Sequence, residues 1–280
     1  MKKYFRLFIW FVLINIIAAC SFEQSKHEMK LHIENRDVGH LTKALIPADF
    51  IPQPLKIAAI GDSLTAGVGD TSNQGGYLHF LKGDLIKLKG VKTVEIFNHG
   101  VSGNRTDQLL KRLTQETVEK DIKKADLVIV TIGGNDLMKI MRDNFTNLQM
   151  DVFLKEEPNY EKRLSNIITT VKKLNPQSTV ILVGLYNPFQ HLFANIKELN
   201  EIVDKWNEIG QQVVSEFEQT YFAPIENIFS DGSIDLLYED SFHPNNKGYS
   251  LIAKEIYATL SEVELTETNE WFVVKEDGNE

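Results

Sequence analysis

The chain has 280 residues, of which 42% are hydrophobic and 25% are charged, which suffices for one large globular domain or at most two small ones. Its formal net charge of −9 argues against a nucleic-acid partner, because contact with phosphates needs an excess of lysine and arginine. The single cysteine, Cys20, excludes disulfide bonds within the chain and metal sites built on thiolates.

The N-terminus has the pattern of an export signal. A basic start (residues 2–6) precedes an apolar run (residues 7–17) that is too short to cross a bilayer. Ile17-Ala18-Ala19-Cys20 resembles the lipobox of bacterial lipoproteins. That resemblance implies that residues 1–19 are a signal peptide and that Cys20 is acylated, which would hold the protein on the extracytoplasmic face of the membrane. An uncleaved anchor, or a cysteine without such a role, is the alternative.

The remainder of the chain divides into three parts. Residues 20–54 are polar and punctuated by prolines near their end, which favours a tether. Residues 55–261 have the patterns of a folded domain. The tail, residues 262–280, is acidic but contains the apolar segment Trp271-Phe272-Val273-Val274. We expect this segment to pack on the domain, as an added edge strand for example, or else to form a partner surface.

Apolar segments alternate with helical patterns through the domain. Five segments are expected as strands: residues 57–60, 93–98, 126–132, 179–185 and 221–224. Helical periodicity covers residues 75–89, 106–125, 163–174, 198–218 and 245–261. The stretch 139–160 is longer and less regular than a crossover needs. This alternation predicts an α/β fold with a parallel sheet covered on both faces.

Polar turns that contain glycine follow the first three expected strands: Gly61-Asp62-Ser63, residues 100–104 and residues 133–136. Because the carboxyl ends of parallel strands meet at one edge of a sheet, these turns should converge. Ser63 would stand at the start of a helix, where backbone N–H groups favour developing negative charge. The alternative is that Asp62 and Ser63 only cap that helix, a role that we expect for Asp62.

A fourth polar segment, Asp240-Ser241-Phe242-His243-Pro244, precedes the last expected helix. The three-residue spacing allows the Asp240 carboxylate to reach Nδ1–H of His243, which leaves Nε2 free to accept a proton. A neutral imidazole suits the activation of a serine hydroxyl near neutral pH. Each polar residue, taken singly, is equally explained as an ordinary loop or capping residue.

The four segments together resemble the conserved blocks of the SGNH/GDSL hydrolase family of esterases and lipases, over about residues 55–260. The resemblance implies a three-layer α/β/α sandwich with a five-stranded parallel sheet of flavodoxin-like order. It assigns Ser63 as nucleophile, with Asp240 and His243 as its catalytic partners. The backbone N–H groups of Ser63 and Gly103 and the side-chain amide of Asn135 would form the oxyanion hole. Within this family the chain is most similar to lipobox-bearing lipoproteins of Gram-positive bacteria, and it departs from the family pattern in residues 139–160 and in the tail.

The expected function is hydrolysis of a small-molecule, lipid or glycan ester through an acyl-enzyme on Ser63, without metal or cofactor. The other six histidines show no metal-ligand spacing. Removal of O-acetyl groups from cell-wall glycans and thioesterase or lysophospholipase activity are alternatives, as is a surface-binding lipoprotein with a silent site. Residues 186–189 are candidates to line an acyl pocket, although loop aromatic residues also serve packing alone.

Overall fold

The computed structural model describes residues 51–144, 146, 149–189, 197–230 and 234–264. The export signal, Cys20 and most of the tether lie outside these residues, as does the tail from residue 265, so that what we expect of them remains a prediction. Among the described residues, no helix combines the length and the apolarity needed to cross a membrane.

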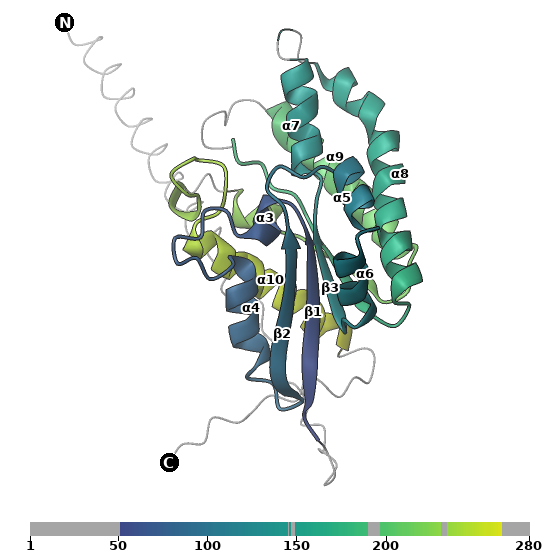
Figure 1. Cartoon of the computed structure of the whole chain (residues 1–280). Helices are drawn as coiled ribbons and strands as arrows, with labels where there is room; N and C mark the ends of the chain where they lie inside the picture. The colour runs from purple at the N-terminus through teal and green to yellow at the C-terminus, as the bar shows by residue number, and fades with distance from the viewer. Residues whose placement is uncertain (1–50, 145, 147–148, 190–196, 231–233, 265–280) are drawn as a thin grey trace, which may run out of the picture. The chain divides into compact units, whose positions relative to one another are not determined.

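Five parallel strands form one sheet in the order β2-β1-β3-β4-β5 (Figure 1). Their bounds are Gln53–Gly61 for β1, Val91–Gly100 for β2, Leu127–Thr131 for β3, Thr179–Val183 for β4 and Thr220–Ala223 for β5. The prediction of a five-stranded parallel sheet of flavodoxin-like order is confirmed. β1 pairs with β2 along its whole length but with β3 only from Ile57 onward, so that Pro54 lies where β1 has a single neighbour.

Helices connect the strands and cover both faces of the sheet. They are α3 (Ser63–Ala66), α4 (Tyr77–Leu85), α5 (Thr106–Arg112), α6 (Glu116–Lys123), α7 (Gly134–Asp143), α8 (Met150–Leu174), α9 (Lys197–Ser215) and α10 (Asn246–Glu264). Two short 3₁₀ turns, η2 (Glu226–Ile228) and η3 (Ile234–Leu236), lie between β5 and α10.

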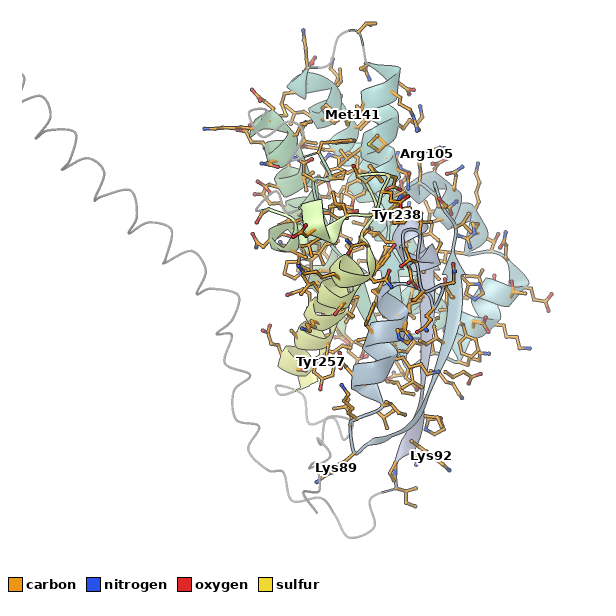
Figure 2. The ribbon with its side chains drawn as sticks, turned by 90° about the vertical axis from the view of Figure 1, so that its left-hand side faces the viewer. Lys89, Lys92, Arg105, Met141, Tyr238 and Tyr257 are labelled. Atoms are coloured by element: carbon orange, nitrogen blue, oxygen red, sulfur yellow. The ribbon has the colours of Figure 1, made fainter. Side chains whose placement is uncertain are left out.

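The alternation of side chains along the strands separates two hydrophobic cores. Ala58 and Ile60 point to the face covered by α5, α6, α8 and α9, whereas Ile57 and Ala59 point to the face covered by α4 and α10. All four side chains are completely buried. Figure 2 shows α4 and α10 side by side in front of the sheet. These two cores make the three-layer sandwich and hold the strand ends rigidly.

The stretch 106–125, expected as one helix, is two. α5 ends at Arg112, and Gln115 adopts an extended conformation (ψ 132°) before α6 begins. The Thr114 hydroxyl donates to the carbonyl of Lys111 at 2.9 Å, a local bond that competes with the helical pattern. Leu113, at the break, is buried against the core. The helical periodicity continues across this break, which is why the sequence pattern does not reveal it.

The irregular stretch 139–160 and the helix expected over 163–174 also need correction. Residues 139–143 complete α7, and α8 begins at Met150 and runs 25 residues to Leu174, with Pro158 inside it. Proline removes one backbone donor and usually ends a helix, so that its presence hides the first half of α8. Burial of Phe153 and Tyr160 on either side of it stabilises the continuous helix. The remaining elements differ from their expected bounds by a few residues at the ends.

Candidate active site

The turn after β1 presents Ser63 at the carboxyl edge of the sheet. Gly61 has φ +148°, and a Cβ at this position would lie 2.1 Å from the carbonyl oxygen of Thr131 in the neighbouring strand. Only glycine therefore fits the turn. The Asp62 carboxylate accepts the backbone N–H of Leu64 at 3.1 Å and so caps α3, as expected. Ser63 is left as the first residue of the helix, with 6% of its surface exposed.

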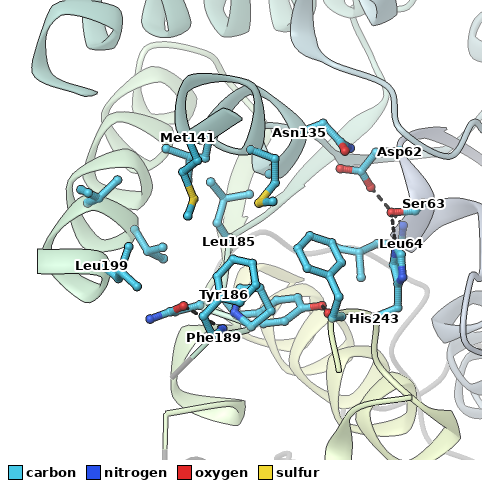
Figure 3. A pocket seen from close by; sticks show the side chains of 18 of the residues that line it. Asp62, Ser63, Leu64, Asn135, Met141, Leu185, Tyr186, Phe189, Leu199 and His243 are labelled. Carbon is cyan, nitrogen blue, oxygen red and sulfur yellow. Dashed lines mark hydrogen bonds between the residues drawn. The ribbon is translucent and has the colours of Figure 1, made fainter. Parts of the chain in front are cut away.

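Three side chains from opposite ends of the domain meet at this turn. His243 Nε2 lies 2.9 Å from Ser63 Oγ (Figure 3). His243 Nδ1 lies 2.6 Å from Asp240 Oδ2. The other oxygen of Asp240 accepts the backbone N–H groups of Phe242 at 3.0 Å and of His243 at 2.9 Å. The carboxylate is thus held by the same turn that carries the imidazole. The structure brings together the serine, histidine and aspartate that the sequence singled out.

The electrostatics of this turn favour an ionised Asp240. Partial burial opposes ionisation, but the hydrogen bonds from the His243 ring and from the two backbone N–H groups outweigh it and lower the pKa of Asp240 below its usual value. A carboxylate that accepts Nδ1–H leaves Nε2 as the acceptor for the Ser63 hydroxyl proton. The arrangement can therefore deprotonate Ser63 when it attacks an electrophile.

Of the three residues expected to form the oxyanion hole, Ser63 and Asn135 line the pocket and Gly103 does not. Asn135, the second residue of α7, lines the same pocket as Ser63, and its Nδ2 donates one hydrogen to the carbonyl of Asn104 at 3.0 Å. Its second N–H is free for another acceptor. Gly103 does not line the pocket, although it precedes Asn104 in the chain. In the described part of the chain, no hydrogen bond uses the backbone N–H of Ser63 or Gly103.

Arg112 supports the neighbouring loop and was not singled out by the sequence. Its guanidinium group donates to Asn104 Oδ1 at 3.0 Å and to the carbonyl of His99 at 2.7 Å, and it approaches the carbonyl of Gly61 at 3.5 Å. One side chain therefore ties the ends of β1 and β2 to the loop that carries Gly103. In the sequence, Arg112 is one of several basic residues in a helical pattern, and no local signal distinguishes it.

The other polar residues near the site have structural partners. Asp136 accepts the backbone N–H of Thr106 at 2.9 Å and its hydroxyl at 2.6 Å, which orders the loop as expected. His99 Nε2 pairs with Asp121 at 2.8 Å and does not line the pocket. In the described part of the chain, no three His, Cys, Asp or Glu residues are grouped so that they could hold a metal ion.

Asp62 has an unusual environment behind the nucleophile. Thr131 Oγ1 donates to its Oδ1 at 2.9 Å. The Thr131 hydroxyl also forms a hydrogen bond with the Thr65 hydroxyl at 2.8 Å, and the Thr65 hydroxyl forms one with the Tyr77 hydroxyl at 2.9 Å. Burial, which leaves only 4% of Asp62 exposed, raises its pKa to about 7 in spite of the hydrogen bonds from Thr131 and Leu64. The carboxyl group next to Ser63 thus titrates near neutral pH.

A pocket of about 80 Å³ opens beside Ser63 and His243 (Figure 3). Residues 186–189 line it, and Tyr186 also packs on Phe229, with ring centroids 4.1 Å apart. The Tyr186 hydroxyl donates to the carbonyl of Phe242 at 2.6 Å, so that the wall of the pocket also supports the turn that carries His243. Apart from the groups around Ser63, the lining is almost entirely apolar.

Comparison with known proteins places the chain in a family. A profile of the GDSL-like Lipase/Acylhydrolase family matches residues 59–251, a region that contains the five residues predicted for the catalytic triad and the oxyanion hole. The chain is 39% identical over 250 residues to "Uncharacterized protein YpmR" of Bacillus subtilis (strain 168), covering 89% of this chain and 92% of that protein. It is 25% identical over 211 residues to "Spore germination lipase LipC" of Bacillus licheniformis, covering 73% and 95%. The crystal structure of lipase Lip_vut3 from a goat rumen metagenome matches with a TM-score of 0.66 at 25% identity, covering 73% of this chain and 97% of that one.

Proposed function

The chain belongs to the GDSL-like lipase/acylhydrolase family of ester hydrolases, and we propose that it acts through an acyl-enzyme on Ser63. The observation that supports this proposal most directly is the hydrogen-bonded series Ser63–His243–Asp240, at 2.9 and 2.6 Å. The same series of groups serves as nucleophile, base and orienting carboxylate in serine hydrolases of unrelated fold.

The reaction proceeds in two halves. Ser63 Oγ attacks the ester carbonyl carbon while His243 Nε2 takes the hydroxyl proton, and the imidazolium is stabilised by Asp240. When the tetrahedral intermediate collapses, His243 returns the proton to the leaving alkoxide, and the acyl group remains on Ser63. A water molecule then gives a proton to His243 and attacks the acyl carbon. When this second intermediate collapses, His243 passes that proton to Ser63 Oγ, which releases the carboxylic acid and restores both groups.

The negative oxygen of each tetrahedral intermediate needs donors that are already in place. The second N–H of the Asn135 amide and the backbone N–H of Ser63 lie at the pocket. Among the described residues, none accepts the N–H of Gly103. Removal of one such donor costs about 3–4 kcal/mol of transition-state stabilisation in other acyl hydrolases. We assign the three groups to this role.

The test is replacement of the nucleophile. Ser63→Ala should abolish turnover of a short-chain p-nitrophenyl ester while leaving the circular dichroism spectrum and the melting temperature unchanged. Ser215→Ala is the matched control, because this exposed hydroxyl at the end of α9 donates to the carbonyl of Gln212 and does not line the pocket. Full activity in the Ser63 variant would exclude the acyl-enzyme mechanism. Wild-type protein without activity toward any ester would favour the surface-binding alternative.

We also propose that the domain is held outside the cytoplasmic membrane by lipid on Cys20. The support is the sequence alone: a basic start, a short apolar run and the segment Ile17-Ala18-Ala19-Cys20. In cells fed labelled palmitate, the wild-type chain should take up label and sediment with membranes. Cys20→Ser should lose the label; equal labelling of both chains would contradict the proposal.

A further inference from the structure

The pocket beside Ser63 is bounded by two helices that face one another. α7 contributes Leu137, Met138 and Met141, and α9 contributes Leu199, Ile202 and Val203. Their spacings of three and four residues place each set on one helix face. In Figure 3, Ser63 and His243 lie at one end of the pocket, Leu199 lies at the opposite end, and Met141 lies on the wall between them and above.

Four of the five polar lining residues gather at the end of the pocket where the chemistry occurs: Asp62, Ser63, Asn135 and His243. The fifth is Asn187, whose Nδ2 donates one hydrogen to Asn200 at 2.7 Å and whose Oδ1 accepts the N–H of Phe189 at 2.9 Å. Apart from Asn187, the far part of the pocket offers a ligand apolar contacts.

We propose that this pocket holds the acyl chain of the substrate, at least about four carbons long, and that Met141 and Leu199 set the longest chain that fits. The inference rests on the proposed acyl-enzyme. Thirteen of the nineteen lining residues are apolar. A fully buried leucine side chain, with four carbons, already contacts about 6–12 residues, whereas the single methyl group of an acetyl ester buries much less apolar surface.

The acyl part of the ester fits this pocket better than the alcohol part does. The acyl group stays bonded to Ser63 between the two halves of the reaction, while the alcohol must leave and water must enter. The loop after β2 is open to solvent: Val101 is 40% exposed, and a Cβ added at Gly103 would meet no atom within 4 Å apart from its chain neighbours. A narrow apolar pocket suits the group that remains bonded to Ser63.

The experiment is a chain-length series of p-nitrophenyl esters from acetate to dodecanoate. For the wild-type protein, kcat/KM should rise about fourfold for each added methylene from acetate to butyrate, the gain that burial of one methylene provides, and should fall once the chain exceeds the pocket. Leu199→Phe, which fills the far end, should move the maximum to shorter chains. Met141→Ala, which enlarges the pocket, should move it to longer chains.

The design distinguishes a change in pocket size from a general effect of substitution. The shifts in opposite directions cannot come from general loss of stability. Leu154→Phe, on the exposed face of α8, should leave the profile unchanged. An acetate maximum with Ser63-dependent activity, or a profile that neither pocket variant moves, would overturn the inference but leave the proposed function standing. Absence of Ser63-dependent hydrolysis at every chain length would overturn both.

Discussion

The loop between α3 and α4 depends on one buried carboxylate, Asp70, of which 7% is exposed. Its two oxygens accept the backbone N–H groups of four residues of the same loop, at 2.9–3.0 Å: Ser72, Gln74, Gly75 and Gly76. The loop packs on the turn that carries His243, because a Cβ at Gly69 would lie 2.4 Å from the carbonyl of Pro244. Asp70 thus stabilises a loop that packs against the turn carrying His243.

The size of this contribution follows from the pKa of Asp70. Burial alone would raise it, but the hydrogen bonds from the Ser72 hydroxyl and the backbone N–H groups lower it from 3.8 to about 2. A lowered pKa means that ionised Asp70 favours the folded state above the unfolded-state pKa, and that this stability is lost as the pH falls through the folded-state pKa. The shift corresponds to about 2 kcal/mol at pH 7 and about 1 kcal/mol at pH 3.

Asp70→Asn tests this reasoning, since an amide approximates the protonated carboxyl group. Urea unfolding should give a free energy of unfolding about 2 kcal/mol below that of the wild type at pH 7, with the difference about halved at pH 3. Asp84→Asn removes a carboxylate that forms a surface ion pair with exposed Lys87, and it should cost less than about 1 kcal/mol at both pH values. A loss at Asp70 that stays the same at pH 7 and pH 3 would refute the electrostatic account.

Three further variants probe the site. Asp240→Asn should lower kcat by about 10³- to 10⁴-fold, because an amide no longer fixes the tautomer of His243; a loss below tenfold would contradict that role. Arg112→Ala leaves the Asn104 and His99 oxygens without their donor, and should lower kcat at least about tenfold and the free energy of unfolding by roughly 1–3 kcal/mol. Asp62 has a pKa raised by burial to about 7, so that the stability it lends below pH 4 is lost as the pH rises to 7. Asp62→Asn should therefore flatten the stability profile over that range, by up to about 4 kcal/mol, and an unchanged profile would exclude the titration.

The fold was largely predictable because local patterns report which side of an element is buried. The run Ile57-Ala58-Ala59-Ile60 is apolar on both sides, and only a strand covered by two helical layers buries both. The polar turns at the strand ends converge for the same topological reason. The contact between Ser63 and His243 could not be predicted from local patterns, because 180 residues separate them. It was predicted because four segments of the chain resemble the conserved blocks of the family and follow in the same order.

Of the features that escaped prediction, the end of α5 has a local cause, and the others depend on residues that are distant in the chain. Thr114 ends α5 because its hydroxyl finds a nearby carbonyl, whereas Pro158 is tolerated in α8 because the residues around it are buried in the core. Arg112 acquires its role only when the ends of β1 and β2 supply carbonyl oxygens. The apolar pocket is likewise built from α7, α8, α9 and two loops, and no single stretch of sequence contains its pattern.

The central claim is that His243 activates Ser63 for covalent attack. Incubation with a fluorophosphonate, followed by intact-mass measurement and peptide mapping, tests it directly. The account predicts one adduct per chain, on Ser63, and a labelling rate that falls at least about a hundredfold in His243→Ala. Absence of an adduct on Ser63, or labelling that is equally fast without the imidazole, would contradict it.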